Sequence, residues 1–157
     1  MPRLRKKQKT PRRKKSLGEK AEMKVEEGFV SGTGRRKTAV ARVFLYQNKG
    51  DILVNGMPIG EYFPSENAEV TWKKPFHALG FSHPTSKFSA TIKVHGSGKS
   101  SQLDAVVLGL SRALASINEE YAVRMSQEGL LTRDSRMVER KKYWLRKARK
   151  APQYSKR

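Results

Sequence analysis

Residues 88–121 read FSATIKVHGSGKSSQLDAVVLGLSRALASINEEY. Apolar and polar residues alternate over 88–94, which is the period-two pattern of a half-buried strand. After Ser101 the apolar residues recur at spacings of three and four, which predicts a long helix packed on a sheet. This apolar stripe comprises Leu103, Val106, Val107, Leu110, Leu114, Ile117 and Tyr121. We expect Ser101 and Asp104 to form a capping box at the start of the helix, and Gly129 to end it.

The preceding sequence predicts further strands and short helices. Residues 38–46 alternate like a strand, and the polar residues 48–51 lead to a second apolar run at 52–54, which predicts a hairpin. Helical pieces are expected near 59–63, closed by Pro64, and near 68–72, closed by Pro75. The fold class is therefore α+β, a small sheet with helices packed on one face.

The distribution of charge divides the 157 residues into three parts. The net charge is +20, but residues 25–131 hold twelve basic and ten acidic residues. Residues 1–24 and 132–157 each carry eleven Lys and Arg against two acids. We expect a basic arm at 1–28 that is disordered when free, a globular core at 29–131 and an extended basic tail at 132–157. A nuclear-import cluster or a solubility device is the other interpretation of the arm.

The composition argues against an enzyme. The chain has no cysteine, and its three histidines, at 77, 83 and 95, fall at spacings that match no helical metal pair. We therefore predict no cofactor, no metal and no small-molecule substrate.

Residues 98–100, Gly-Lys-Ser, resemble the end of a nucleotide-binding loop, but Lys93 stands where that motif needs its first glycine. We interpret the segment as a glycine turn whose Lys99 can meet a nucleic-acid phosphate.

The basic tail combines arginines with aromatic residues. Arginine pairs with phosphates and aromatic rings stack on unpaired bases, which is typical of RNA binding. A membrane-surface helix is the rival interpretation, but only four apolar residues would form its buried face. No apolar run is long enough to span a bilayer, so we predict neither secretion nor membrane association. A DNA-binding basic protein remains an alternative.

Several motifs, in this order, resemble the S9 family of small-subunit ribosomal proteins, of the bacterial or organellar kind. They are GTGRRKTAVARV at 32–43, the NGMP to EYF stretch at 55–63, LLTRD at 130–134, ERKKY at 139–143 and KARKAPQYSKR at 147–157. The resemblance begins near residue 29 and leaves the first 28 residues outside it. It implies a body like domain 2 of ribosomal protein S5, located in the head of the small subunit of a cytoplasmic or organellar ribosome.

The resemblance also implies partners and site residues. The body and tail would bind small-subunit rRNA beside neighbouring head proteins, and the tip of the tail would approach the peptidyl-site tRNA. The candidate rRNA-binding residues are Arg35, Arg36, Lys37, Arg42, Lys99, Arg133, Arg136, Arg140, Lys141, Lys142, Tyr143, Arg146, Lys147, Arg149 and Lys150. The candidate tRNA-binding residues are Ser155, Lys156 and Arg157.

Overall fold

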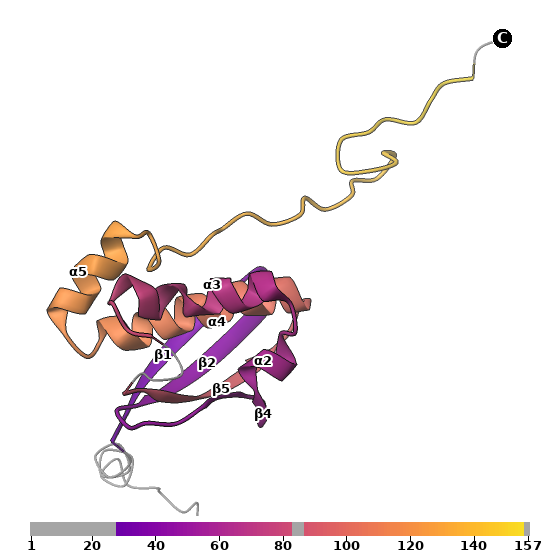
Figure 1. Cartoon of the computed structure of the whole chain (residues 1–157). Coiled ribbons are helices and arrows are strands. Elements are labelled where there is room, and N and C mark those ends of the chain that lie inside the picture. The colour runs from indigo at the N-terminus through magenta and orange to yellow at the C-terminus, as the bar shows by residue number, and fades with distance from the viewer. Residues whose placement is uncertain (1–27, 83–86, 156–157) are drawn as a thin grey trace, which may run out of the picture.

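The computed structural model describes residues 28–82 and 87–155. Within these residues a five-stranded sheet is covered on one face by helices (Figure 1). The strands are β1 (Phe29–Arg36), β2 (Ala39–Tyr46), β3 (Ile52–Val54), β4 (Met57–Pro58) and β5 (Ser89–His95). The helices are α2 (Ile59–Tyr62), α3 (Glu66–Ala78), α4 (Lys99–Ala115) and α5 (Glu119–Gln127). The predicted α+β class is confirmed.

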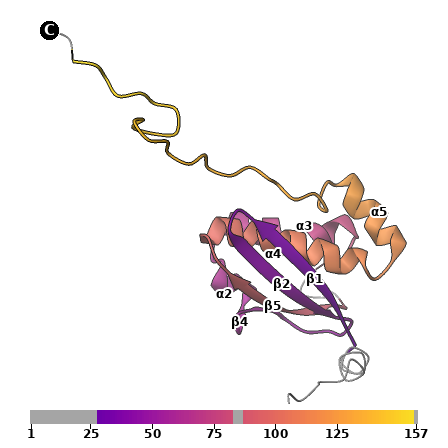
Figure 2. The same ribbon diagram turned by 180° about the vertical axis from the view of Figure 1, so that it is seen from behind.

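The order of the strands is β1-β2-β5-β3-β4. β2 runs antiparallel to both β1 and β5, whereas β3 is parallel to β5 and antiparallel to β4. The predicted hairpin between residues 38–46 and 52–54 is therefore wrong, because β5 lies between those two strands (Figure 2). β2 forms seven residue pairs with β5, although β5 is distant from it in the sequence. β3 has only three residues and would form a shorter ladder with β2.

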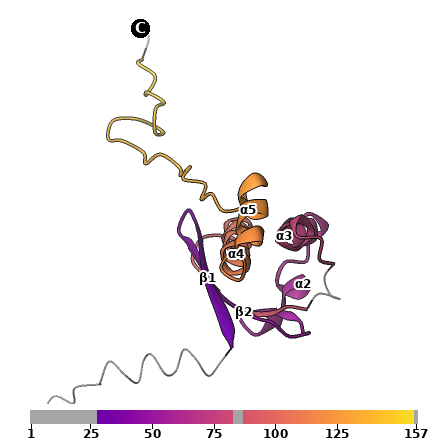
Figure 3. The same cartoon turned by 90° about the vertical axis from the view of Figure 1, so that its left-hand side faces the viewer.

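The contact between β1 and α4 is a backbone contact. A β-carbon on Gly34 would lie 1.8 Å from the carbonyl oxygen of Ala105, and one on Gly32 would lie 2.2 Å from that of Gly109. A β-carbon on Gly109 would in turn lie 2.7 Å from a methyl group of Val43. Glycine is required at these positions because no side chain fits between the strand and the helix. Figure 3 shows α4 nearly end-on, between β1 on one side and α3 on the other.

The core fills the space between the sheet and the helices. The inward positions of β2 and β5 alternate with exposed or half-buried ones, so each strand buries one face. Large side chains from α3 and α4 close the other side of the core. The largest buried residues include Val43, Leu45, Ile52, Ile92, Phe76, Val106, Leu110 and Leu114. In the described part of the chain, none of the helices has the length and apolar character needed to cross a membrane.

The start of α4 differs from the prediction. The helix begins at Lys99 with Gly98 as its N-cap, so the predicted capping box at Ser101 is wrong. Ser101 is buried within the first turns, and Asp104 instead forms an ion pair with Arg36. Pro75 does not end α3 either, because the helix continues to Ala78 and buries Pro75 in the core.

The predicted long helix is two helices. α4 ends at Ala115, and the side chain of Asn118 accepts a hydrogen bond from the backbone N–H of Glu120 at 3.2 Å to start α5. Asparagine is a favoured N-cap, and its local hydrogen bond competes with continuation of the helix. The predicted stop at Gly129 is confirmed, since its φ of +69° and the bond from Leu130 N–H to Met125 O form a Schellman turn after α5.

Replacing Gly34 with alanine tests the close approach of α4 to β1. We expect Gly34→Ala to lower the free energy of unfolding by about 2–3 kcal/mol, because the new methyl group must displace the helix backbone. Gly60→Ala is the matched control, since Gly60 is helical and has open space around its β-position. The control should unfold within about 0.5 kcal/mol of the parent in urea. Equal stabilities for both variants would contradict the packing described.

Candidate nucleic-acid interface

The sheet face that the helices leave uncovered carries cations near the β1–β2 turn. Arg35 and Arg42 are exposed and alternate with buried neighbours on their strands. Arg42 lies opposite Lys93 in the register of β2 and β5. Lys37 is exposed in the turn itself, with a φ of +50°. The structure thus gathers three predicted residues and adds Lys93, which the polar positions of the 88–94 alternation could have indicated.

Aromatic side chains continue this face toward the far end of the same strands. Phe29 meets Phe44 edge to face, with ring centroids 5.4 Å apart, and Tyr46 lies 6.0 Å from Phe29. All three are half-buried, so each ring is partly available to a partner. We call this surface the open sheet face and define it by Arg35, Arg42, Lys93, Phe29, Phe44 and Tyr46. Cations beside aromatic rings suit a partner that has both phosphates and bases.

Lys99 has a different neighbourhood from the one predicted. Its ammonium group lies 3.2 Å from the centroid of the Tyr62 ring and 3.4 Å from the Tyr62 carbonyl oxygen. A cavity of about 570 Å³ beside it is lined by residues that include Phe63, Pro64 and Leu103. The cation therefore stabilises the packing of α2 against the start of α4, and its proposed contact with phosphate stays a prediction.

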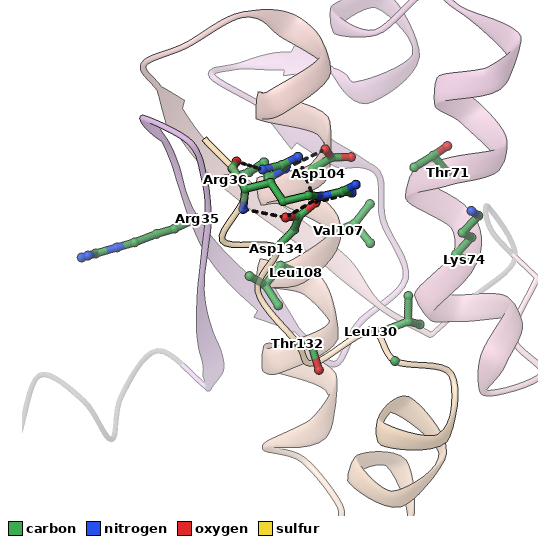
Figure 4. Close-up of a pocket in the computed structure, with 12 residues that line it drawn as sticks. Arg35, Arg36, Thr71, Lys74, Asp104, Val107, Leu108, Leu130, Thr132 and Asp134 are labelled. Atoms are coloured by element: carbon green, nitrogen blue, oxygen red, sulfur yellow. Dashed lines mark hydrogen bonds and ion pairs between the residues drawn. The ribbon is translucent and has the colours of Figure 1, made fainter. Parts of the chain in front are cut away.

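Arg36 joins the body to the start of the tail (Figure 4). Its Nη2 lies 3.0 Å from Oδ2 of Asp134, and its Nε lies 3.5 Å from Oδ2 of Asp104 on α4. Its Nη1 donates a 2.6 Å hydrogen bond to the carbonyl oxygen of Arg136. Only 14% of the side chain is exposed. Figure 4 shows Arg35 pointing away from this cluster, so adjacent arginines of β1 have opposite orientations.

The cluster, which we call the tail anchor, comprises Arg36, Asp104, Asp134 and Arg136. Asp134 accepts hydrogen bonds from the backbone and guanidinium of Arg136 at 2.7 to 3.1 Å. The predicted rRNA-binding residues Arg36 and Arg136 are thus engaged within the chain. Sequence reasoning missed Asp104 and Asp134 as their partners, because no strand was predicted at residues 29–36 and the inward orientation of Arg36 was therefore unknown.

The anchor stabilises the ionised form of Asp134. Hydrogen bonds from the Arg136 side chain, followed by its backbone N–H, lower the pKa of Asp134 from 3.8 to about 2, and the charge of Arg36 adds to this effect. A lowered pKa means that the folded anchor favours the carboxylate. The contribution is therefore complete above the ordinary pKa of 3.8 and is lost as the pH falls through about 2.

Residues 132–155 contain neither helix nor strand and extend away from the body (Figures 1 and 2). All ten predicted rRNA-binding side chains in this segment are exposed. Arg136, Lys142 and Arg149 form ion pairs within the tail. The others are Arg133, Arg140, Lys141, Tyr143, Arg146, Lys147 and Lys150. Beyond the contacts of Asp134 and Arg136 with Arg36, this cationic segment exposes its side chains to solvent, where they are available to a polyanion.

Part of the tail folds back on itself in what we call the tail loop, residues 139–150. Glu139 pairs with Lys142 at 3.0 Å and with Arg149 at 2.9 Å, and these contacts lower the pKa of Glu139. The N–H of Arg146 also donates to the carbonyl of Lys150 at 2.7 Å. Exposed ion pairs contribute only about 0–1 kcal/mol, so Lys142 and Arg149 can exchange Glu139 for a phosphate.

The structure reaches the tip of the tail only in part. Ser155 is exposed, whereas Lys156 and Arg157 lie outside the described residues. The predicted basic arm lies outside them as well, except for Gly28. Among the residues that the structure does describe, no group of histidines and carboxylates could hold a metal ion.

Replacing Asp134 with asparagine tests the tail anchor. The chain has no native cysteine, so spin labels can be placed at Gly60→Cys on the body and Val138→Cys in the tail. We expect a narrow distance distribution at neutral pH that broadens with Asp134→Asn, because the amide cannot hold both arginines. The parent distribution should broaden as the pH falls toward 2. Asp51→Asn, which changes an exposed carboxylate, is the control; equal broadening by both variants would contradict the anchor.

Comparison with known proteins identifies the family of the chain. Residues 34–157 match the family model of ribosomal protein S9/S16. The small ribosomal subunit protein uS9 of Thermus thermophilus is 50% identical over 126 residues, covering 80% of this chain and 96% of its own length. The uS9 proteins of Mesoplasma florum and Cytophaga hutchinsonii are 48% and 44% identical, covering 84% and 82% of this chain and 98% of their own lengths. The chain therefore belongs to the ribosomal protein S9/S16 family, which is a family of ribosomal components and not of enzymes.

Proposed function

We propose that this protein is a structural component of the small ribosomal subunit that binds its rRNA through two surfaces. One is the open sheet face together with the β1–β2 turn, and the other is the exposed tail. The functional division is a core at 29–131 that folds around the sheet and a tail at 132–157 that penetrates the RNA. The first 28 residues form a separate basic arm.

The main support for this proposal is the excess of positive charge in the tail. It has eleven Lys and Arg and only two acids, Asp134 and Glu139. Asp134 is held in the tail anchor, and Glu139 is paired within the tail loop. The remaining cations of residues 132–155 face solvent around Tyr143, with no folded body behind them. A polyanion with unpaired bases satisfies both kinds of side chain, which favours rRNA over the membrane and DNA alternatives.

The tip of the tail and the helical flank of the body have further roles in this proposal. Residues 155–157 approach the anticodon stem of the peptidyl-site tRNA, where Arg157 offers a guanidinium fork and Lys156 a mobile ammonium group to the phosphates. The helical face of the body, built from α3 and α5, is less cationic and is available to neighbouring proteins of the subunit head. The family relatives, named as small ribosomal subunit proteins, support only the assignment to the small subunit.

Salt dependence of rRNA binding tests the role of the tail. The slope of log affinity against log salt changes by about 0.7–0.9 for each phosphate that the protein no longer neutralises. We expect the triple change of Arg140, Lys141 and Lys147 to alanine to reduce the magnitude of that slope by about 2–3. These three side chains have no ion pair among the described residues. The control removes the same charge from Lys49, Lys87 and Arg124 on the body and should leave the slope nearly unchanged.

Deleting residues 155–157 tests the role of the tip. The deletion removes only two cationic side chains from a chain of +20, so rRNA affinity and subunit assembly should be preserved. We expect the truncated subunits to bind peptidyl-site tRNA more weakly by about 1–3 kcal/mol, the value of one or two charge-assisted hydrogen bonds. Filter binding of tRNA to purified subunits measures the difference. Equal tRNA affinity for intact and truncated subunits would remove the tip from the proposed function.

A further inference from the structure

Trp144 occupies a backbone conformation that disfavours its side chain. Its φ is +63°, in the left-handed region where glycine is the residue of choice. A bulky residue there brings its β-carbon too close to the neighbouring carbonyl oxygen, so the conformation costs free energy. Backbone strain of this kind persists where another contact compensates for it.

The described part of the chain does not provide that contact. Trp144 is 86% exposed and its neighbour Tyr143 is 84% exposed. The aromatic and cation–π contacts found among the described residues lie in the body and do not involve Trp144. The other tryptophan, Trp72, is only 4% exposed, which is the usual outcome for an indole ring in a folded protein.

The tail loop presents this ring at its turn. Leu145 N–H donates to the carbonyl of Lys142 at 3.4 Å, which brings the chain around Trp144. Glu139 holds Lys142 and Arg149 on either side of that turn. These exposed ion pairs are weak and are screened by salt, so they do not offset the strain by themselves. A partner outside the chain must therefore stabilise the ring in this position.

The surroundings of the ring identify the chemistry of the partner. Residues 140–150 contain seven Lys and Arg, so the partner is strongly anionic. The ring itself needs a flat apolar surface, and an unpaired nucleobase offers one beside its own phosphates. Bases in a duplex are already stacked on one another and leave no face free. We propose that Trp144 stacks on an unpaired base of the RNA that the tail binds, an inference that rests on the proposed rRNA binding.

Replacing Trp144 in the full chain distinguishes a ring that stacks on a base from a ring that has no partner. Trp144→Gly relieves the backbone strain and removes the ring. If the ring stacks on a base, this variant should bind a single-stranded oligoadenylate about tenfold more weakly. If the ring has no partner, the variant should bind equally well or more tightly. Trp144→Tyr keeps an aromatic ring and should bind within about threefold of the parent, whereas Trp144→Leu should resemble the glycine variant.

Tryptophan fluorescence provides the second measurement. Because Trp72 is buried, the emission that responds to RNA comes from Trp144. We expect quenching by the single-stranded oligoadenylate and little quenching by an RNA duplex of equal length. Full affinity in Trp144→Gly or Trp144→Leu, or equal quenching by the duplex, would overturn the stacking role while leaving RNA binding by the tail intact. Failure of the parent chain to bind either RNA would overturn the proposed function and the stacking inference together.

Discussion

Gly32 and Gly34 let the backbone of α4 lie directly on the backbone of β1, and the site geometry follows from that contact. With a larger side chain at either position the helix would stand further from the strand. Arg36, at the end of β1 on the same face as the two glycines, could then no longer reach Asp104 on α4. The close packing at Gly32 and Gly34 thus places Arg36 where it can bind the start of the tail.

The attachment of the tail to Arg36 is also electrostatic, because it uses one of the two acids of the tail. Asp134 is held between Arg36 and Arg136, whose hydrogen bonds and charge lower its pKa, so its carboxylate is ionised at neutral pH. Glu139 pairs with two cations further along the tail loop. The acids of the tail therefore serve to organise it, whereas the unpaired cations face outward. Rigid attachment at one end reduces the conformational entropy that the tail loses when it enters RNA.

Local patterns in the sequence predicted β2, β3 and β5 and most of the helical residues, but not β1 or β4, and they did not predict how the strands pair. The alternation over residues 88–94, the stripe after Ser101 and the stop at Gly129 correspond to β5, α4 and the end of α5. Strand pairing was wrong because the pattern of a strand does not identify its neighbour, and β5 follows β3 by more than thirty residues. The break at Asn118 was missed because the apolar spacing continues across it.

For the candidate site, too, the sequence predicted which residues are exposed better than it predicted their contacts. Arg35, Arg42 and the exposed tail cations lie on the surface, as a basic motif predicts. Charge alone could not separate Arg35 from Arg36, which differ in the face of β1 on which they stand. Likewise, composition marked Trp144 as an aromatic residue of the tail but could not indicate its left-handed backbone. The face on which an arginine stands and the backbone conformation of Trp144 depend on neighbours in the folded chain.

A structure of the assembled small subunit containing this chain would show directly whether the tail binds rRNA while the tail anchor holds. We expect the open sheet face and residues 137–155 to contact rRNA, while Arg36 still bridges Asp104 and Asp134. A tail that lies in solvent, or an Arg36 that leaves the two carboxylates to bind a phosphate, would be the opposite result.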